Sequence, residues 1–510
     1  MTRLTWRLIL SVVALIAFAG QSAPAWQSRD SGYNVSVGGT LPTPQLVYHW
    51  ATVPNPVGSG QKGTAYKLYI PPVGAGDTII LATNVPNGRT VTITDSASDS
   101  SPTALCTADA GSGNFKSSLY AFVPTTGVTW INVGVSGAQF AGFDAEVSEW
   151  NNVGTTLQGS ASCTASNAST AGVVTPTAIS ATNNDATGGN LLFNYTVLAG
   201  PSAGTPACQT SNYTAGNGFV LLNGDTSTAL NGNGFGFQHS TMALVQTTAA
   251  SIAAKITLTG ETCSSGNGDP YNSATVALKV QTSGITYPST IHVIKDIEID
   301  TFNWASPTVP ATWLFPFSSR GNLRVFMFDG AVDHTYAVAN TVTSSDGCNF
   351  TQSTGSGNDI LIFWYAQNCS PCDNCTITFN MTPGGSLNIS AGRFYDIANA
   401  AASSYVGRAG NNIGAANQTS VTHDPDYTPT NATLILVMGQ NGFGPTTGIT
   451  SPTGVYWTCA LYTGQTDGDY MCSGDGHAYY YAPTTAPENW SWSIVSQPGG
   501  SIAGTVAEFK

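Results

Sequence analysis

Short apolar stretches recur along the whole chain and carry its strongest structural signal. Each runs or alternates over four to eight residues, is rich in β-branched and aromatic side chains, and is bounded by Gly, Asn, Asp, Ser or Pro, as in residues 78–81, 118–122 and 129–133. Both patterns are typical of β-strands. Helical periodicity is almost absent. We therefore expect an all-β protein of tandem β-sandwiches, of jelly-roll or immunoglobulin-like type.

The apolar stretches also recur as an internal repeat. Six segments of the first half return in the same order in the second half, at an offset near 240 residues. The matched segments are 76–81 with 321–326, 118–122 with 360–364, 129–133 with 376–380, 141–151 with 391–396, 190–193 with 432–436, and 275–279 with 505–510. Loops change length more readily than strands, which explains why the offset drifts. The pattern predicts two homologous repeats.

The first 25 residues have the pattern of a secretory signal peptide. Arg3 and Arg7 precede an apolar stretch from Leu8 to Ala19, and small residues follow at the spacing that a signal peptidase reads. We expect a secreted or cell-surface protein with a mature chain that starts near Trp26. The expected organisation is a signal peptide (1–25), a linker (26–40), the first repeat (41–281), a linker (282–285) and the second repeat (286–510). Each repeat is long enough for one large sandwich or two small ones.

Charged side chains are scarce and mostly acidic. They make up 8% of the chain, against about 25% in ordinary soluble domains. Loss of the two signal-peptide arginines takes the formal net charge from −13 to −15. Such a chain repels phosphate backbones and acidic membranes, so we expect no nucleic-acid partner. No later apolar stretch is long enough to span a bilayer. The oligomeric state stays open.

The ten cysteines are an even number, which in an exported chain favours disulfides over metal sites. Cys369, Cys372 and Cys375 have a spacing that indicates zinc or iron–sulfur binding in cytosolic proteins. In an exported protein we expect these cysteines to staple a loop through disulfides. Sequence alone does not fix the connectivity. Two further candidate pairs are Cys208 with Cys263 and Cys459 with Cys472.

The repeated pattern resembles a known kind of module. A strand that opens with Gly-Asp at 76–77, the Thr-Asp-Ser turn that closes segment 90–96, a further apolar strand and the Glu-Trp-Asn turn at 149–151 are similar to uncharacterised secreted bacterial β-sandwich repeat modules, of immunoglobulin-like or jelly-roll type. In the second repeat, Asp346 is the only echo of the Thr-Asp-Ser turn. The resemblance implies a surface, adhesive or accessory role and supplies no catalytic residues.

Two acidic groups are candidate cation sites. Asp296, Glu298 and Asp300 alternate with isoleucines, so their carboxylates project from one face of a strand. Carboxylates this close repel one another unless they are solvated or bridged by a cation, and calcium prefers several such oxygen ligands. The alternatives are therefore a solvated outer face and a structural calcium ion, the one candidate cofactor. The second group has the same alternatives and comprises Asp467, Asp469 and Asp475.

Aromatic pairs are the best indication of a ligand. Tyr479 and Tyr481 alternate on one strand, and Trp490 and Trp492 alternate on another. Rings two residues apart share a face of the strand, and such a row can stack on the face of a sugar. The alternative is that the rings fill the core or pack across strands. These four residues are the candidate glycan-binding residues.

No set of catalytic residues stands out. Residues 200–204 fit the G-x-S-x-G pattern of a nucleophile elbow, but no helix pattern follows them, and a plain turn fits equally well. We therefore expect a non-enzymatic extracellular protein, a surface, adhesive or glycan-binding component whose partner is a glycan or a cell-surface component. The alternatives are a secreted polysaccharide-active hydrolase and a structural subunit that assembles into filaments or layers through its sheet edges.

Overall fold

The described part of the chain is all-β, which confirms the expected fold class. The computed structural model describes residues 43–51, 65–99, 102–109, 115–136, 144–166, 173–181, 190–199, 212–224, 237–246, 250–259, 271–281, 290–299, 312–330, 339–353, 361–381, 389–413, 420–423, 433–450, 456–457, 461–462, 473–482, 490–494 and 502–510. The expected signal peptide and both expected linkers lie outside these ranges. Within them, no helix offers an apolar length that could cross a bilayer.

A ten-stranded sheet forms the middle of the molecule. Its strands are β1 (Gln45–Ala51), β3 (Thr78–Pro86), β5 (Cys106–Asp109), β6 (Phe115–Phe122), β8 (Asp144–Asn151), β20 (His292–Ile299), β22 (Leu323–Gly330), β24 (Thr351–Ser353), β25 (Leu361–Gln367) and β27 (Ile389–Ala398). They are ordered β24-β25-β22-β27-β20-β1-β8-β3-β6-β5. The central neighbours β1 and β20 run parallel, and the other neighbouring pairs of this sheet run antiparallel.

Both faces of the central sheet are buried, which explains the runs of consecutive apolar residues in strands such as β3. In β3 every residue from Thr78 to Val85 is buried. Successive side chains of a strand point to opposite faces. Accordingly, Ile79 and Leu81 belong to one core cluster, and Ile80 belongs to another. A strand covered on both faces needs an apolar residue at nearly every position.

A nine-stranded sheet covers one face of the central sheet. Its side chains complete two core clusters with the central strands, one in each half of the chain. Its strands are β9 (Val153–Leu157), β10 (Ser162–Ser166), β13 (Asn190–Ala199), β15 (Val220–Gly224), β16 (Phe237–Gln246), β19 (Tyr271–Val280), β21 (Thr312–Ser319), β23 (Ala339–Ser344) and β26 (Cys372–Met381). The order is β10-β19-β13-β16-β15-β21-β26-β23, with β9 beside β19.

Two further sheets cover the opposite face, and one large core cluster joins them to the central sheet. The first, ordered β32-β2-β7-β4, contains β2 (Ala65–Tyr69), β4 (Val91–Asp95), β7 (Trp130–Val135) and β32 (Leu461–Tyr462). The second, ordered β28-β35-β30-β33-β31, contains β28 (Tyr405–Ile413), β30 (Thr433–Thr450), β31 (Tyr456–Trp457), β33 (Ser473–Ala482) and β35 (Ile502–Phe509). The far end of β30 also pairs with β34 (Trp490–Ile494), which pairs with β29 (Ser420–His423).

A small outer sheet packs on the free face of the nine-stranded sheet. It is ordered β11-β18-β14 and contains β11 (Val173–Val174), β14 (Asn212–Gly216) and β18 (Lys255–Thr259). Its apolar side chains meet those of β13, β15, β16 and β19 in a fourth core cluster. A two-stranded ribbon of β12 (Ile179–Ala181) and β17 (Ala250–Ile252) lies in the same half. The N-terminal half is therefore four sheets deep.

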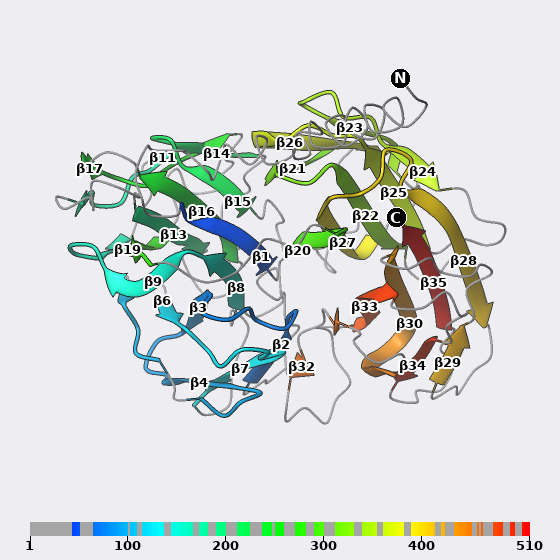
Figure 1. Ribbon diagram of the computed structural model, residues 1–510, viewed down its shortest axis with the longest axis horizontal. Coiled ribbons are helices and arrows are strands. Elements are labelled where there is room, and N and C mark those ends of the chain that lie inside the picture. The colour runs from blue at the N-terminus through cyan, green and yellow to red at the C-terminus, as the bar shows by residue number, and fades with distance from the viewer. Residues whose placement is uncertain are drawn as a thin grey trace, which may run out of the picture.

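The strand order is the same on both sides of the β1–β20 pair. Outward from β1 the central strands are β8, β3, β6 and β5, and outward from β20 they are β27, β22, β25 and β24. Figure 1 shows the two halves side by side, β1 to β19 on the left and β20 to β35 on the right, meeting at β1 and β20. Two covering sheets also cross between the halves, through the β15–β21 and β2–β32 pairs.

Candidate functional site

Within the described ranges eleven charged side chains are buried, although the whole chain has only 15 basic and 28 acidic residues. A buried charge is costly unless hydrogen bonds or an opposite charge compensate it. Most of the eleven gather at three places: the two faces of the β1–β20 pair, and the surroundings of Cys348, Cys369, Cys372 and Cys375. The buried charged residues are Asp77, Asp95, Glu146, Glu149, Lys295, Asp296, Arg320, Arg324, Arg393, Asp396 and Glu508.

A hydrogen-bonded chain of buried side chains lies between the β1–β20 pair and the nine-stranded sheet. His49 on β1 contacts two polar groups: Nδ1 lies 2.7 Å from Ser148 Oγ, and Nε2 lies 2.8 Å from Asn223 Oδ1. Asn223 Nδ2 in turn donates to Glu146 Oε1 at 3.2 Å. Because burial, and secondarily the charge of Lys295, lower the pKa of His49 to about 3, the imidazole is neutral at physiological pH. It therefore donates from Nε2 to Asn223 and accepts from the Ser148 hydroxyl.

Glu146 is the acidic centre of this chain. His239 Nε2 lies 2.9 Å from its Oε1, and the Thr241 hydroxyl donates to its Oε2. The His239 ring also lies against Tyr195, with ring centroids 6.2 Å apart. Each Glu146 oxygen thus has a donor from β15 or β16, so the carboxylate ties the central sheet to its covering sheet.

Lys295 joins the two halves at the same place. It is fully buried on β20, directly beside His49 of β1. Its ammonium donates to Leu222 O at 3.1 Å in the N-terminal half, and to Ser318 O and Oγ, both at 2.8 Å, in the C-terminal half. Burial lowers the pKa of Lys295 to about 7, although the charge of Asp396 acts against the shift. Three acceptors match the three protons of the ammonium, but they are neutral groups.

Asp296 lies on the other face of β20 and has a basic neighbour. Its carboxylate is fully buried, and its Oδ1 lies 3.5 Å from Arg393 Nε. The Arg393 guanidinium in turn lies 5.8 Å from the centre of the Trp50 ring, a distance that allows a cation–π contact. The alternative of a solvated outer face is therefore wrong for Asp296. Because Arg393 supplies a positive charge, the carboxylate is balanced here by a side chain of the protein itself.

Of the remaining candidate calcium ligands, Glu298 and Asp475 have backbones that lie on described strands. The backbone of Glu298 lies on β20 opposite Arg393, and that of Asp475 lies on β33 opposite Gln440. Their side chains lie outside the described residues, as do Asp300, Asp467 and Asp469. Calcium at either acidic group stays a prediction.

Tyr479 belongs to the core. It is fully buried and packs edge-on against Tyr395 at a centroid distance of 6.3 Å. Burial raises the pKa of both Tyr48 and Tyr479, so both keep their phenolic protons. Tyr481 is partly buried, and its hydroxyl accepts a hydrogen bond from Val293 N at 2.9 Å. The core alternative therefore holds for Tyr479, whose ring faces are unavailable to a sugar.

Trp490 and Trp492, the other aromatic pair, lie two residues apart on β34. They pair with His423 and Val421 of β29. Their side chains lie outside the described residues, so a row of rings on this strand stays a prediction.

A carboxylate caps the turn into an inner strand in each half. Asp396 on β27 accepts from Arg320 N at 2.9 Å, Gly321 N at 3.0 Å and the Ser319 hydroxyl at 2.7 Å. In the N-terminal half, Glu149 accepts from Gly74 N at 2.9 Å. Burial raises the pKa of Glu149, and neighbouring Asp77 adds to the rise through its charge and a hydrogen bond. These acids therefore have structural roles.

Arg324 and Asp346 form an ion pair beside the cysteine loop. Arg324 Nη1 and Nη2 donate to the two Asp346 oxygens at 3.0 and 2.7 Å, and Nη2 also donates to Ser370 O at 2.8 Å. Burial tends to raise the pKa of Asp346, but hydrogen bonds from Arg324 and Ser344 outweigh it, so the pKa lies below its usual value. Arg324 Nη2 also lies 3.6 Å from Cys372 Sγ.

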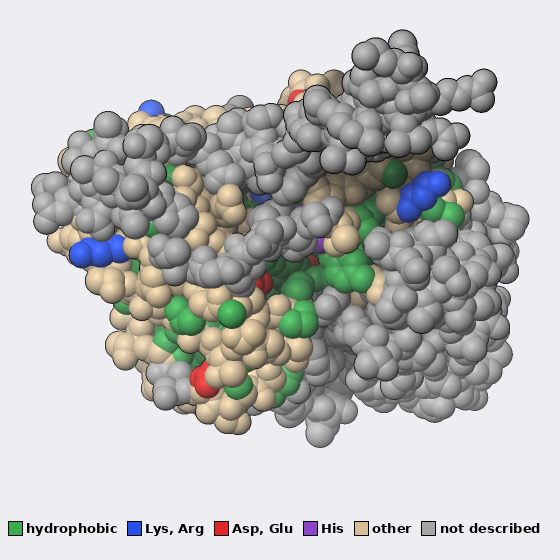
Figure 2. Space-filling model, viewed as in Figure 1, with side chains coloured by type: hydrophobic (Ala, Val, Ile, Leu, Met, Phe, Trp, Pro, Cys, Tyr) green, Lys and Arg blue, Asp and Glu red, His purple; other side chains and the backbone are tan. Residues whose placement is uncertain are grey.

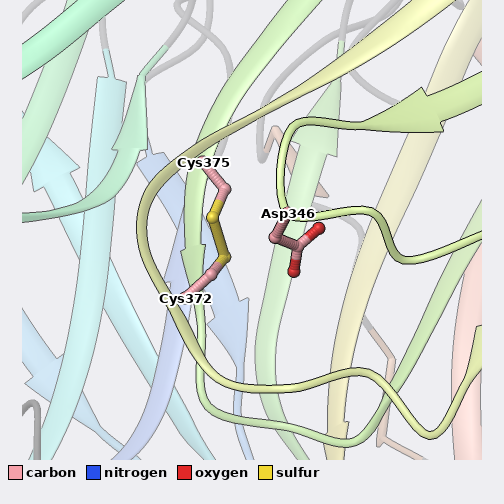
Figure 3. A group of neighbouring side chains, drawn as sticks. All are labelled: Asp346, Cys372 and Cys375. Carbon is pink, nitrogen blue, oxygen red and sulfur yellow. A yellow bond between two sulfur atoms is a disulfide. The ribbon is translucent and has the colours of Figure 1, made fainter.

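Three cysteine pairs lie at disulfide distance, which confirms the expectation of disulfides for these six residues. Cys348–Cys369 and Cys372–Cys375 staple the predicted loop, and Cys106–Cys163 joins the edge strand β5 to β10. Figure 3 shows the Cys372–Cys375 bond with the Asp346 carboxylate beside it. The candidate partners Cys208, Cys263, Cys459 and Cys472 lie outside the described residues.

The same loop has the cysteine spacing of a metal site, the alternative to disulfides, and its donors fit a metal poorly. One ligand atom each from Asp346, Cys372 and Cys375 lies within 4.8 Å of the others. The two sulfurs are bonded to each other, however, and thiolates rather than disulfides bind metal ions. Both oxygens of Asp346 are already occupied by Arg324. Disulfide stapling is the better account of this loop.

Sequence analysis missed most of these buried polar residues. Lys295, Arg324 and Glu146 each stand inside a strand of a chain that is otherwise poor in charge. A charge within an inner strand was the available signal, but partners such as Asp346, Ser318 and Thr241 are 22 to 95 residues away in sequence and become visible only after folding. No protein-family model matches the sequence, and no curated protein matches it either.

Proposed function

We propose that the protein is an exported, non-enzymatic component of the cell surface that binds neutral glycans. The observation that carries the proposal is where its few charges lie. Among the described residues eleven are buried, and several of them, such as Glu146, Lys295 and Arg324, form hydrogen bonds or ion pairs between segments that are distant in sequence. What is left for a partner outside is a surface dominated by neutral hydroxyl, amide and apolar groups, which suits a sugar better than a charged polymer.

One face of the described part agrees with this proposal. On the face that Figure 2 shows, neutral side chains and backbone cover most of the described surface, with few charged groups. Binding to such a surface depends on hydrogen bonds and ring stacking, so salt should weaken it little.

The disulfides support export. Three cysteine pairs lie at bonding distance, and such bonds persist in oxidising compartments outside the cytoplasm. Together with the expected signal peptide, they favour a secreted or surface location.

Trp490 and Trp492 are the proposed sugar-contacting residues. They share a face of β34, a strand at the periphery that pairs with β29 and the end of β30. Tyr479 is excluded because it is buried, and the hydroxyl of Tyr481 is engaged with the backbone of β20.

A glycan array with the purified mature protein tests the proposal. We expect binding to uncharged polysaccharides, and we expect it to persist in 1 M salt. At that salt concentration the electrostatic screening length is about 3 Å, so binding driven by charge would be lost. Trp490→Ala and Trp492→Ala should each weaken binding about tenfold or more, consistent with stacking worth about 1–2 kcal/mol.

Tyr481→Phe is the matched control, because it keeps an aromatic ring on β33, a strand that does not pair with β34, and should leave binding unchanged. The proposal would be overturned if binding were lost in 1 M salt, or if no glycan bound at all. Release of reducing sugar would favour the hydrolase alternative, and sedimentation as large assemblies would favour the structural subunit.

We further propose that the two halves are homologous repeats of a β-sandwich module, similar to secreted bacterial immunoglobulin-like or jelly-roll modules. The six matched sequence segments fall on β3/β22, β6/β25, β7/β26, β8/β27, β13/β30 and β19/β35, which occupy corresponding places in the strand orders. One detailed correspondence also supports the proposal. Asn152 and Asn399 both have positive φ, 60° and 58°, and donate to Thr43 O and Thr290 O.

A further inference from the structure

The geometry points to Cys372–Cys375 as a thiol–disulfide exchange site, in which Cys372 is the leaving thiolate and Cys375 the sulfur attacked by a small thiol of the glutathione class. This function is independent of glycan binding. It rests on the loop that carries the two cysteines and on the arginine beside one of them.

The Cys372–Cys375 pair closes a much smaller ring than the other two described disulfides. Its cysteines are 3 residues apart, against 21 for Cys348–Cys369 and 57 for Cys106–Cys163. A disulfide stabilises a fold mainly when it closes a long loop. The short pair contributes least to the fold, so it can open while the surrounding sheets stay intact.

The electrostatic surroundings distinguish the two sulfurs. Arg324, from β22, places Nη2 3.6 Å from Cys372 Sγ. Arg320 donates from Nη1 to Cys372 O at 3.2 Å and pairs with Asp373 through Nη2. The acidic neighbours, Asp346 and Asp373, are each held by one of these arginines. A nearby guanidinium favours the thiolate over the thiol, so Cys372 is the better leaving group.

The site lies close to solvent. The two sulfur-bearing residues are buried, but Asp373 and Asn374 between them are exposed. Asn374 has a positive φ of 52°, and its side-chain oxygen accepts from Leu221 N of β15 at 3.2 Å. A small thiol can therefore approach the pair from the loop side, and opening of the bond would act next to a contact between the two halves.

A thiolate of the small thiol attacks Cys375 Sγ, a mixed disulfide forms, and the bond to Cys372 breaks to leave a thiolate that Arg324 stabilises. A second small thiol then attacks the mixed disulfide and releases Cys375, which takes a proton from solvent. Two small thiols are oxidised to one small disulfide, and the protein disulfide gains two electrons.

The first test is redox titration of the purified, oxidised protein. The protein is equilibrated in glutathione buffers of increasing reducing strength, free thiols are alkylated, and each cysteine is quantified by mass spectrometry. We expect Cys372 and Cys375 to become labelled together, in less reducing buffers than the other cysteine pairs. The equilibrium constant for their reduction by glutathione should differ from those of the other pairs by about tenfold or more, which is about 30 mV for a two-electron couple. Simultaneous labelling of all pairs, or earlier labelling of Cys348 and Cys369, would overturn the proposal.

The second test compares the two sulfurs without changing an arginine. In Cys375→Ser the remaining thiol is Cys372, and in Cys372→Ser it is Cys375. We expect Cys372 to be alkylated about tenfold faster than Cys375 at pH 7. The alkylation rate of Cys372 should also reach half its maximum at a lower pH than that of Cys375. Equal rates, or a faster Cys375, would overturn the assignment of the leaving group.

Arg324→Gln and Arg320→Gln give the third comparison. Both arginines are buried in one cluster, but only Arg324 reaches the sulfur. Arg324→Gln should shift reduction of the pair to more reducing buffers, and Arg320→Gln should shift it less. If Arg324→Gln does not fold, as judged by circular dichroism, the single-cysteine comparison decides.

Discussion

Lys295 shows how one residue can make the stability of this protein depend on pH. It is fully buried and bonded to three neutral oxygens, and its pKa falls from 10.5 to about 7. The unfolded chain therefore binds a proton more tightly than the folded protein does. Between about pH 7 and 10.5 the unfolded state carries more protons at this site, so stability from this residue is least below pH 7 and rises with pH.

Replacing Lys295 by methionine should remove that dependence. From pH 7 to 9 the free energy of unfolding of the wild type should rise relative to Lys295→Met, by up to about 1.4 kcal/mol per pH unit. Urea unfolding at several pH values measures the difference. Lys279→Met, on the partly buried end of β19, is the matched control and should follow the wild type. A constant difference between wild type and Lys295→Met would contradict the prediction.

Gly321 is required by a close approach of two chain segments. A Cβ there would overlap the carbonyl oxygen of Ile397 and the carboxylate of Asp396. Gly321→Ala should therefore lower the free energy of unfolding by about 2–3 kcal/mol, as overpacking does elsewhere.

Gly134→Ala is the control for Gly321. The nearest atoms to its added Cβ are in Thr92, at ordinary contact distances of 3.7–3.8 Å. We expect a change within about 0.5 kcal/mol, since no backbone must move. The melting temperatures of both variants test the prediction. If Gly321→Ala and Gly134→Ala lower the melting temperature equally, the turn at Gly321 has room for a Cβ.

At the scale of elements, burial on both faces explains the run of apolar residues from Ile79 to Ala82 in β3. The last strand, β35, lies inside a sheet between β28 and β30, as the sequence predicts for residues 506–509. Its Phe509 is fully buried and packs against the rings of Tyr365 and Tyr405.

Phe509→Ala should lower the free energy of unfolding by about 3–5 kcal/mol, the range for removing a buried aromatic ring. Val406→Ala, on the neighbouring β28, is the control because Val406 is 40% exposed. Removing residues 503–510 should be more severe and prevent the C-terminal half from folding. Differential scanning calorimetry measures all three. An unchanged melting temperature after truncation would mean that β35 is dispensable.

At the scale of the molecule, the two halves share sheets. The β1–β20, β15–β21 and β2–β32 pairs all cross from one half to the other. In the same region, Lys295 of the C-terminal half donates to Leu222 O of the N-terminal half. A boundary at residues 282–285 therefore separates segments of sequence whose sheets are continuous in space.

We expect the whole protein to unfold in one cooperative transition, and neither 41–281 nor 286–510 to reach its stability when produced alone. An isolated half would expose the edge of β1 or β20 and the buried charges beside it. Calorimetry of the whole chain and of each half tests this. A half that melts at the temperature of the intact protein would show that the shared sheets add no stability.

The sequence by itself determined the all-β class and the positions of many strands, because a strand reports its burial through its own apolar residues. It also gave the even cysteine number from which disulfides follow. Only the tertiary structure decided that Asp296 is paired with Arg393, that Tyr479 lies in the core, and that Lys295 bridges the halves. Each of these outcomes depends on which strands become neighbours, and pairing between distant segments leaves no trace in the pattern of either one alone.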